Sequence, residues 1–117
     1  MNRMFALQNY TAIEPDIRRI AETPGLLRAT PLGGADKSET LDFLARRPVH
    51  TVVMTSFIID NGIESELNRG KFFGYRGADG QLEGVALIGH STLVEARTAD
   101  ALKALAFKAR TSSVRFI

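Results

Sequence analysis

The sequence contains no cysteine among its 117 residues. Disulfide bonds, thiolate nucleophiles and cysteine-based zinc sites are therefore excluded. Long apolar runs are also missing. Charged residues interrupt the first 25 positions, where a signal peptide would need an apolar core, and no segment approaches the ~20 apolar residues of a membrane span. We therefore expect a soluble, cytoplasmic protein with no membrane partner.

Charge of one sign is not concentrated anywhere in the sequence. The formal net charge is +2, and the tightest basic groups are Arg18-Arg19 and Arg46-Arg47. A nucleic-acid-binding protein usually carries a basic stripe, so we expect no nucleic-acid partner. His50 has no second histidine at ligand spacing and no carboxylate cluster beside it, so we interpret it as structural and expect no metal.

The segment Lys71–His90 is the most informative part of the chain. It begins with aromatic residues suited to a strand, passes through Gly77–Gly80, and ends with the apolar run Val85–Ile88. The residues at 77–80 tolerate positive φ, so the chain can reverse there. A continuous apolar run is typical of a strand covered on both faces. The segment therefore predicts a β-hairpin.

The region before the hairpin predicts one strand and two helices. Residues 26–32 read as a short strand, and Asp36 with Glu39 has the spacing of a helix capping box. Residues 49–59 are rich in β-branched side chains, which favours a strand, but their length, a preceding proline and a following Asn-Gly favour a helix. In the first helix, the positions expected to face the core are Leu41, Leu44 and Ala45.

The region after the hairpin predicts a third strand at 91–96, a helix capped by Thr98 and a last strand at 114–117. The expected fold is α/β (α+β), with a mixed, mostly antiparallel sheet flanked by helices. The predicted element order is strand, two helices, three strands, helix, strand. The stripe of the last helix that we expect to be buried consists of Ala101, Leu102, Leu105, Ala106 and Ala109.

The two ends of the chain carry separate expectations. Residues 1–25 include a helical stripe and are predicted to form an arm or helix, while residues 26–117 form the domain. Val114–Ile117 reads as an apolar strand at a bare terminus, which is uncommon because exposed edges invite unwanted pairing. We therefore expect the natural chain to continue beyond Ile117, with cover by a neighbouring element or a partner as the alternative.

The order of elements forms a recognisable pattern together with five segments: Leu41–Pro48, Asn61-Gly62, Arg69–Arg76, Asp79–His90 and Leu93–Arg97. This pattern resembles the GNAT superfamily of N-acetyltransferases, and more narrowly the N-terminal GNAT-like region of two-part bacterial acetyltransferases. The likeness covers residues 26–117 and adds weight to a helix at 49–59.

The resemblance implies acetyl-CoA as cofactor of the full-length protein. In that superfamily a loop of the form (Arg/Gln)-x-x-Gly-x-(Gly/Ala) opens a helix, and its backbone N–H groups bind the pyrophosphate. Here Thr98–Asp100 holds the corresponding place, without glycine and with an acidic side chain that would repel phosphate. We therefore expect no cofactor on this chain alone, and no activity from it in isolation.

Glu83, Tyr75 and His90 are the candidate catalytic residues. The resemblance implies that a strand glutamate such as Glu83 takes the proton of an acceptor amine. The Tyr75 phenol would protonate a leaving thiolate, and His90 at a strand end would suit a proton shuttle. The structural alternatives are a solvent-facing carboxylate, which applies equally to Glu95, a core aromatic and a hydrogen-bonded loop histidine.

Two features leave further alternatives open. The aromatic residues Phe72, Phe73 and Tyr75 are of the kind that stack nucleobases in RNA-binding sheets, but Gly74, the acidic turn and the lack of an RNA-binding motif argue against this. Gly84 within a strand indicates a bulge or a close backbone approach, which would either widen a ligand groove or simply bend the sheet.

These observations predict the non-catalytic N-terminal portion of a GNAT-related, acyl-CoA-dependent N-acetyltransferase that helps to form the acceptor-substrate cleft. The expected partner is the chain's own C-terminal catalytic domain or a second subunit, including a homodimer. The alternative is a small-ligand-binding or dimerising regulatory module without acyltransferase activity.

Overall fold

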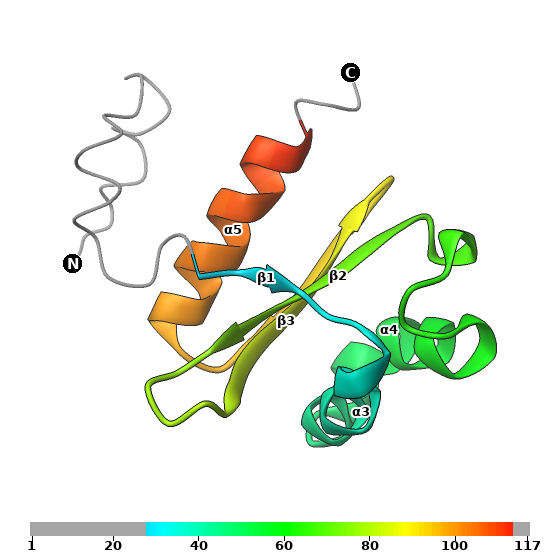
Figure 1. Ribbon diagram of the computed structural model, residues 1–117, viewed down its shortest axis with the longest axis horizontal. Helices are drawn as coiled ribbons and strands as arrows, with labels where there is room; N and C mark the ends of the chain where they lie inside the picture. The colour runs from blue at the N-terminus through cyan, green and yellow to red at the C-terminus, as the bar shows by residue number, and fades with distance from the viewer. Residues whose placement is uncertain (1–27, 114–117) are drawn as a thin grey trace.

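The computed structural model describes residues 28–113, which form a four-stranded sheet with helices on both faces (Figure 1). Every pairing among the described strands is antiparallel, in the order β1-β2-β3-β4. The strands are β1 (Thr30–Pro31), β2 (Gly70–Arg76), β3 (Leu82–Gly89) and β4 (Thr92–Ala96). The helices are α3 (Lys37–Ala45), α4 (Pro48–Asn61) and α5 (Ala99–Ser113), with 3₁₀ turns at Gly34–Asp36 and Glu66–Asn68. The predicted α+β class and the order of these elements are confirmed.

The sheet separates two apolar cores, because successive side chains of a strand point to opposite faces. Helices α3 and α4 cover one face and α5 covers the other (Figure 1). Phe72, Val85 and Leu87 lie in the α3/α4 core, whereas Phe73 and Ala86 lie in the α5 core. The aromatic residues of β2 are therefore divided between two faces, and the hypothesis of a shared base-stacking platform is wrong.

The prediction of a helix at 49–59 is confirmed by α4. The β-branched composition of this segment favours a strand, but its ends specify a helix. Pro48 occupies the first helical turn, and the Gly62 N–H donates to the Ile58 carbonyl at the other end. The Thr51 hydroxyl donates to the Leu44 carbonyl at 2.7 Å, so a buried polar side chain joins α4 to α3.

Two expectations for α3 are wrong. Asp36 and Glu39 do not form a capping box: Asp36 accepts from the Gly33 N–H, and Glu39 forms an ion pair with Arg76. Ala45 is exposed rather than in the core, although Leu44 is fully buried. Both carboxylates form ion pairs with Arg76 on β2. These contacts join residues far apart in the sequence, so local spacing does not reveal them.

Thr98 caps α5 as predicted, since its hydroxyl accepts from the Ala101 N–H at 3.1 Å. The predicted buried stripe is wrong in part. Ala101 and Leu105 are fully buried, but Leu102 is 52% exposed and Ala106 is also exposed. Ala104 takes a core position that the apolar spacing did not single out.

Gly84 lets α5 lie close to the sheet. A Cβ at this position would meet the Leu105 Cδ1 at 2.8 Å and the Ala101 Cβ at 2.9 Å. The helix therefore occupies the space beside Gly84, and the hypothesis of a ligand groove there is wrong. The register irregularity of the hairpin lies beside Gly84: Tyr75 pairs with Gly84 and Arg76 with Leu82, so Glu83 is the extra residue of β3. The predicted bulge is therefore present.

The expectations for residues 1–25 and for a strand at 114–117 lie outside the described residues. Of the described residues 28–32 in the predicted strand at 26–32, Thr30–Pro31 pair as β1. The third strand begins at Thr92 rather than Ser91. None of the helices between residues 28 and 113 has the length and apolar character needed to cross a bilayer.

Candidate functional site

The structure does not bring the three predicted catalytic residues together. Glu83 lies near the start of β3 and His90 directly after its end, about 20 Å apart along an extended strand. Tyr75 lies opposite Gly84 and is therefore near Glu83 rather than His90. The three residues therefore do not share one site, and the role proposed for each stays a separate prediction.

Tyr75 is a core aromatic residue. It is buried among the residues beneath α5, and the Arg28 guanidinium lies 5.7 Å from the centre of its ring. This is the structural alternative considered for Tyr75, and it leaves the phenol within the α5 core rather than in an open cleft.

Glu83 is engaged at the start of α5. Its Oε1 accepts from the Thr98 hydroxyl at 3.0 Å, and its carbonyl accepts from the Arg97 N–H at 2.8 Å. The same Thr98 hydroxyl accepts from the Ala101 N–H. Glu83 and Asp100, which lies in the first turn, thus add two acidic groups to this helix N-terminus.

Glu95 does not face water as a lone strand carboxylate would. It is buried, and its Oε2 lies 3.3 Å from the Arg47 Nε, an ion pair without hydrogen-bond geometry. Arg97 lies over the Phe43 ring and donates to the Phe43 carbonyl at 2.5 Å. Burial lowers the pKa of Arg97, and the nearby positive charge of Arg46 lowers it further. This cluster joins β4 to the turn between α3 and α4.

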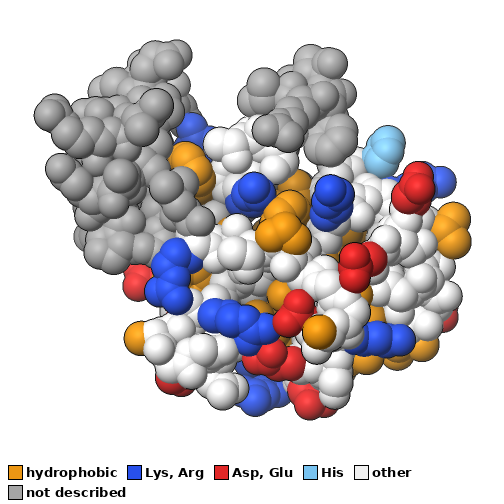
Figure 2. Space-filling view, in the orientation of Figure 1, with side chains coloured by type: hydrophobic (Ala, Val, Ile, Leu, Met, Phe, Trp, Pro, Cys, Tyr) orange, Lys and Arg blue, Asp and Glu red, His pale blue; other side chains and the backbone are white. Residues whose placement is uncertain are grey.

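His50 is exposed in the first turn of α4. Across residues 28–113, no three histidine or carboxylate side chains gather in a way that could hold a metal ion. On the face shown in Figure 2, positive and negative side chains are interspersed over the sheet and helices rather than sorted by sign.

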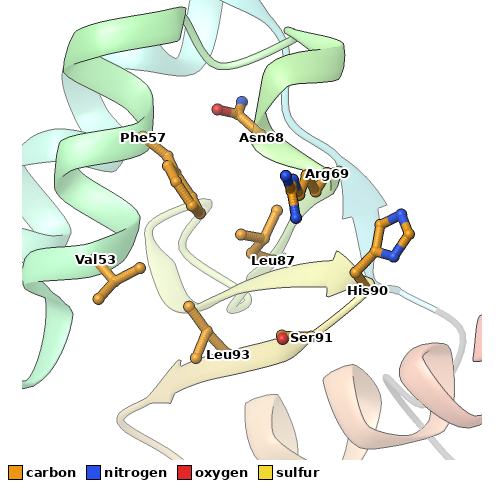
Figure 3. A pocket seen from close by; sticks show the side chains of 8 residues that line it. All are labelled: Val53, Phe57, Asn68, Arg69, Leu87, His90, Ser91 and Leu93. Atoms are coloured by element: carbon orange, nitrogen blue, oxygen red, sulfur yellow. The ribbon is translucent and has the colours of Figure 1, made fainter.

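A pocket of about 320 Å³ lies where α4 meets the ends of β3 and β4 (Figure 3). This volume is at the lower end of the range for small-molecule sites. The pocket is open to solvent, and its apolar lining residues are Val53, Phe57, Leu87 and Leu93. Asn68 is a buried polar residue of the lining, and the exposed residues Arg69, His90 and Ser91 form its polar rim.

Two glycines build the polar rim by letting two backbone segments meet. Gly70 and Gly89 are directly paired across β2 and β3, and a Cβ on Gly89 would lie 2.2 Å from the Arg69 carbonyl oxygen. The His90 N–H donates to that same carbonyl at 3.1 Å. The close approach therefore brings the backbones of Arg69 and His90 together at one side of the pocket.

Arg69 has a left-handed backbone, with φ 60° and ψ 34°. This conformation is uncommon for a residue with a Cβ and costs on the order of 1 kcal/mol. Asn68 holds it in place: its Nδ2 donates to the Gly62 carbonyl at 2.8 Å, and its Oδ1 accepts from Asn61 at 2.9 Å. The Asn68 side chain is thus occupied by internal hydrogen bonds, and Arg69 is the cationic group of the rim.

The electrostatics of the pocket favour an anion with an apolar body. Among residues 28–113, no carboxylate lies within ion-pair distance of the Arg69 guanidinium. Its planar fork can bind a carboxylate or phosphate through two hydrogen bonds. The Ser91 hydroxyl and the His90 imidazole add polar groups at the rim, and Phe57 and Leu93 offer apolar contact.

Sequence reasoning found His90 and missed the residues that accompany it. The missed signal is two polar residues, each next to a glycine: Arg69-Gly70 where the hairpin begins and Gly89-His90 where it finishes. An antiparallel pairing of these ends places both polar side chains at one edge of the sheet. No protein-family model, no curated protein and no solved structure matches this chain, so the likeness to GNAT enzymes remains a resemblance.

Proposed function

We propose that this chain is a non-catalytic GNAT-like domain whose pocket at Arg69 and His90 forms part of an acceptor-substrate cleft. The proposal rests on the different locations of the pocket and of the helix start where the coenzyme would bind. An open pocket with a free cation lies beside α4, whereas the helix start that would hold the coenzyme lies at the other end of β3 and is closed by internal contacts.

The start of α5 does not fit a bound coenzyme A. Thr98 already satisfies the Ala101 N–H through its hydroxyl and the Leu102 N–H through its carbonyl. Glu83 and Asp100 add negative charge where a pyrophosphate would need positive potential and open backbone amides. This misfit supports a domain that leaves acyl transfer to another domain or subunit.

The pocket supports an acceptor that carries its own anionic group. Arg69 would bind a carboxylate of that acceptor, and Phe57, Leu87 and Leu93 would hold an apolar body. A small-ligand-binding regulatory module is the second candidate. It is favoured by the same pocket, and it requires no catalytic partner.

Two titrations test the proposal. Coenzyme A added to the purified chain and followed by calorimetry should give no saturable heat, and acetyl-CoA should not be consumed in the presence of amines. Saturable coenzyme A binding that Thr98→Gly or Asp100→Asn strengthens would overturn the proposal, because it would place the cofactor at α5.

The pocket is tested with short aliphatic carboxylates and their uncharged amides. Amide chemical shifts in NMR spectra should move at Arg69, His90 and Ser91 with the carboxylates and not with the amides. Arg69→Gln should weaken this binding about tenfold, since it keeps hydrogen bonding and removes the charge. Lys71→Gln, two residues further along in β2 and outside the pocket, is the matched control. Equal responses to acid and amide would sink the assignment of Arg69.

A further inference from the structure

Helix α4 is apolar on its solvent-facing side as well as on its core side. Thr51, Met54 and Ile58 are buried against the domain. The exposed fractions on the other side are large: Val49 82%, Ile59 62%, Val52 56% and Val53 49%. A helix that is hydrophobic all round is normally buried on all sides, and a continuous exposed apolar patch marks an interaction surface.

These residues form one stripe along the whole helix. Val49, Val53, Ser56 and Asp60 follow one another at intervals of four, three and four, with Val52 and Ile59 beside them. Hydrophobic side chains reach the surface at the lower right of Figure 2, where Figure 1 places α4. Ser56, a small exposed residue near the middle of the stripe, leaves room for another helix to approach.

Charges at the two ends of this stripe have opposite signs. Arg46 and Arg47 are exposed at the start of α4, and Asp60 and Glu64 are exposed at its end. This order is unfavourable for α4 alone, because a helix N-terminus attracts anions and a C-terminus attracts cations. No acidic residue lies in the first turn of α4 and no basic residue in its last. A second α4 in antiparallel orientation supplies the missing charges at both ends.

We propose that two copies of this chain associate through α4, with the helices antiparallel about a two-fold axis near Val53. Such an axis places Val53 of one copy on Val53 of the other, with Val49 and Val52 beside it. It also places Asp60 of each copy near Arg46 and the helix N-terminus of its partner, twice in one interface. This inference goes beyond the proposed function, and its test does not depend on any ligand.

The dimer borders the pocket, since Val53 belongs both to the stripe and to the pocket wall. One helix face is a small interface compared with the ~800 Å² per partner of a standard complex, so we expect dissociation in the micromolar range. The association should therefore be visible as a concentration-dependent mass.

Sedimentation equilibrium on the whole chain tests the dimer. The wild-type mass should rise toward twice that of the monomer with concentration, and Val52→Lys should weaken association at least about tenfold by placing like charges at the two-fold interface. Because Val52 is exposed, the variant should keep its circular dichroism spectrum and melting temperature. Leu102→Lys, at a similarly exposed apolar position on α5, is the matched control and should dimerise like the wild type.

Charge reversal tests the antiparallel geometry separately. Arg46→Glu alone and Asp60→Arg alone should each weaken association about tenfold, whereas the double variant should regain it, because each pair is then attractive with its signs exchanged. A monomer at about 0.5 mM would overturn the proposal. A dimer that Val52→Lys leaves intact would overturn it as well, by showing that another surface pairs.

Discussion

The β2–β3 hairpin has an arginine at each end: Arg69 at the open end, just before β2, and Arg76 at the turn. The two arginines differ in whether internal groups bind them. Arg76 donates to Glu39 at 2.8 Å, to Asp36 at 3.0 Å and to the Gly80 carbonyl at 2.9 Å. The hydrogen bond with Glu39 raises the pKa of Arg76 and lowers that of the carboxyl. Arg69 has none of these partners among the described residues and has a left-handed backbone.

The charge of Arg76 is therefore used in internal ion pairs, whereas the charge of Arg69 is available to a ligand. The Arg76 end ties the sheet to α3 with internal ion pairs, while the neighbouring α5 start is closed by Glu83 and Thr98. At the Arg69 end, an unfavourable left-handed backbone conformation holds a cation beside an apolar pocket. The comparison predicts that changes at the Arg76 end alter stability, whereas changes at the Arg69 side chain alter binding.

Gly89→Ala should give the largest loss. Its new Cβ would lie 2.2 Å from the Arg69 carbonyl oxygen and 2.5 Å from the Gly70 Cα, and backbone cannot give way as a flexible side chain can. We expect a loss of about 3 kcal/mol in the free energy of unfolding, measured by urea denaturation. Gly34→Ala is the control, since its Cβ would meet nothing closer than 3.8 Å. A loss below about 1 kcal/mol for Gly89→Ala would disprove the close approach.

Arg76→Ala should cost about 1–2 kcal/mol of stability. It removes three hydrogen bonds and leaves Asp36 and Glu39 side by side without a cation. Arg69→Ala is the matched variant at the other end and should stay within about 0.5 kcal/mol of the wild type, because no ion pair is lost. Equal losses for the two variants would remove the distinction between the two ends.

The fold was largely predictable because its signals are local. The hairpin follows from aromatic residues, a glycine-rich turn and an apolar run, and α4 follows from its end residues even though its β-branched composition opposes a helix. The strand and helix order needed no long-range information. The errors in α3 and α5 concern the capping box, which the ion pairs of Arg76 replace, and the choice of buried face, which depends on packing against the sheet.

The site was poorly predictable because its determinants are not local. Glu83 and His90 have plausible chemistry in the sequence, but β3 separates them by its full length. The left-handed backbone of Arg69 depends on the hydrogen bond from Asn68 to the end of α4. Neither this conformation nor the absence of an ion-pair partner for Arg69 among the described residues can be read from the sequence. No spacing rule in the sequence distinguishes this arginine from Arg76.

Arg69→Gly should raise stability while weakening binding. Glycine adopts a positive φ without steric cost, so the free energy of unfolding should increase by about 0.5–1 kcal/mol, and the response to short carboxylates should disappear. Lys71→Gly on an ordinary strand position is the control and should lower stability. A destabilised Arg69→Gly variant would show that the side chain supports the fold, contrary to the comparison.

Acid titration should produce the smallest effect, and its sign follows from Glu39. The hydrogen bond from Arg76 lowers the pKa of Glu39 below its ordinary value of 4.5 in the folded protein. The folded state therefore binds the Glu39 proton less readily than the unfolded chain, so this contribution is complete above the unfolded pKa and is lost as pH falls toward the folded one. Glu39→Gln should remove this part of the acid dependence. Because Glu39 is 39% exposed, the change should stay below about 1 kcal/mol. Urea unfolding from about pH 7 to about pH 3 measures it, with exposed Asp42→Asn on the same helix as control. If the difference between wild type and Glu39→Gln does not shrink on acidification, the ion pair at the Arg76 end contributes nothing to stability.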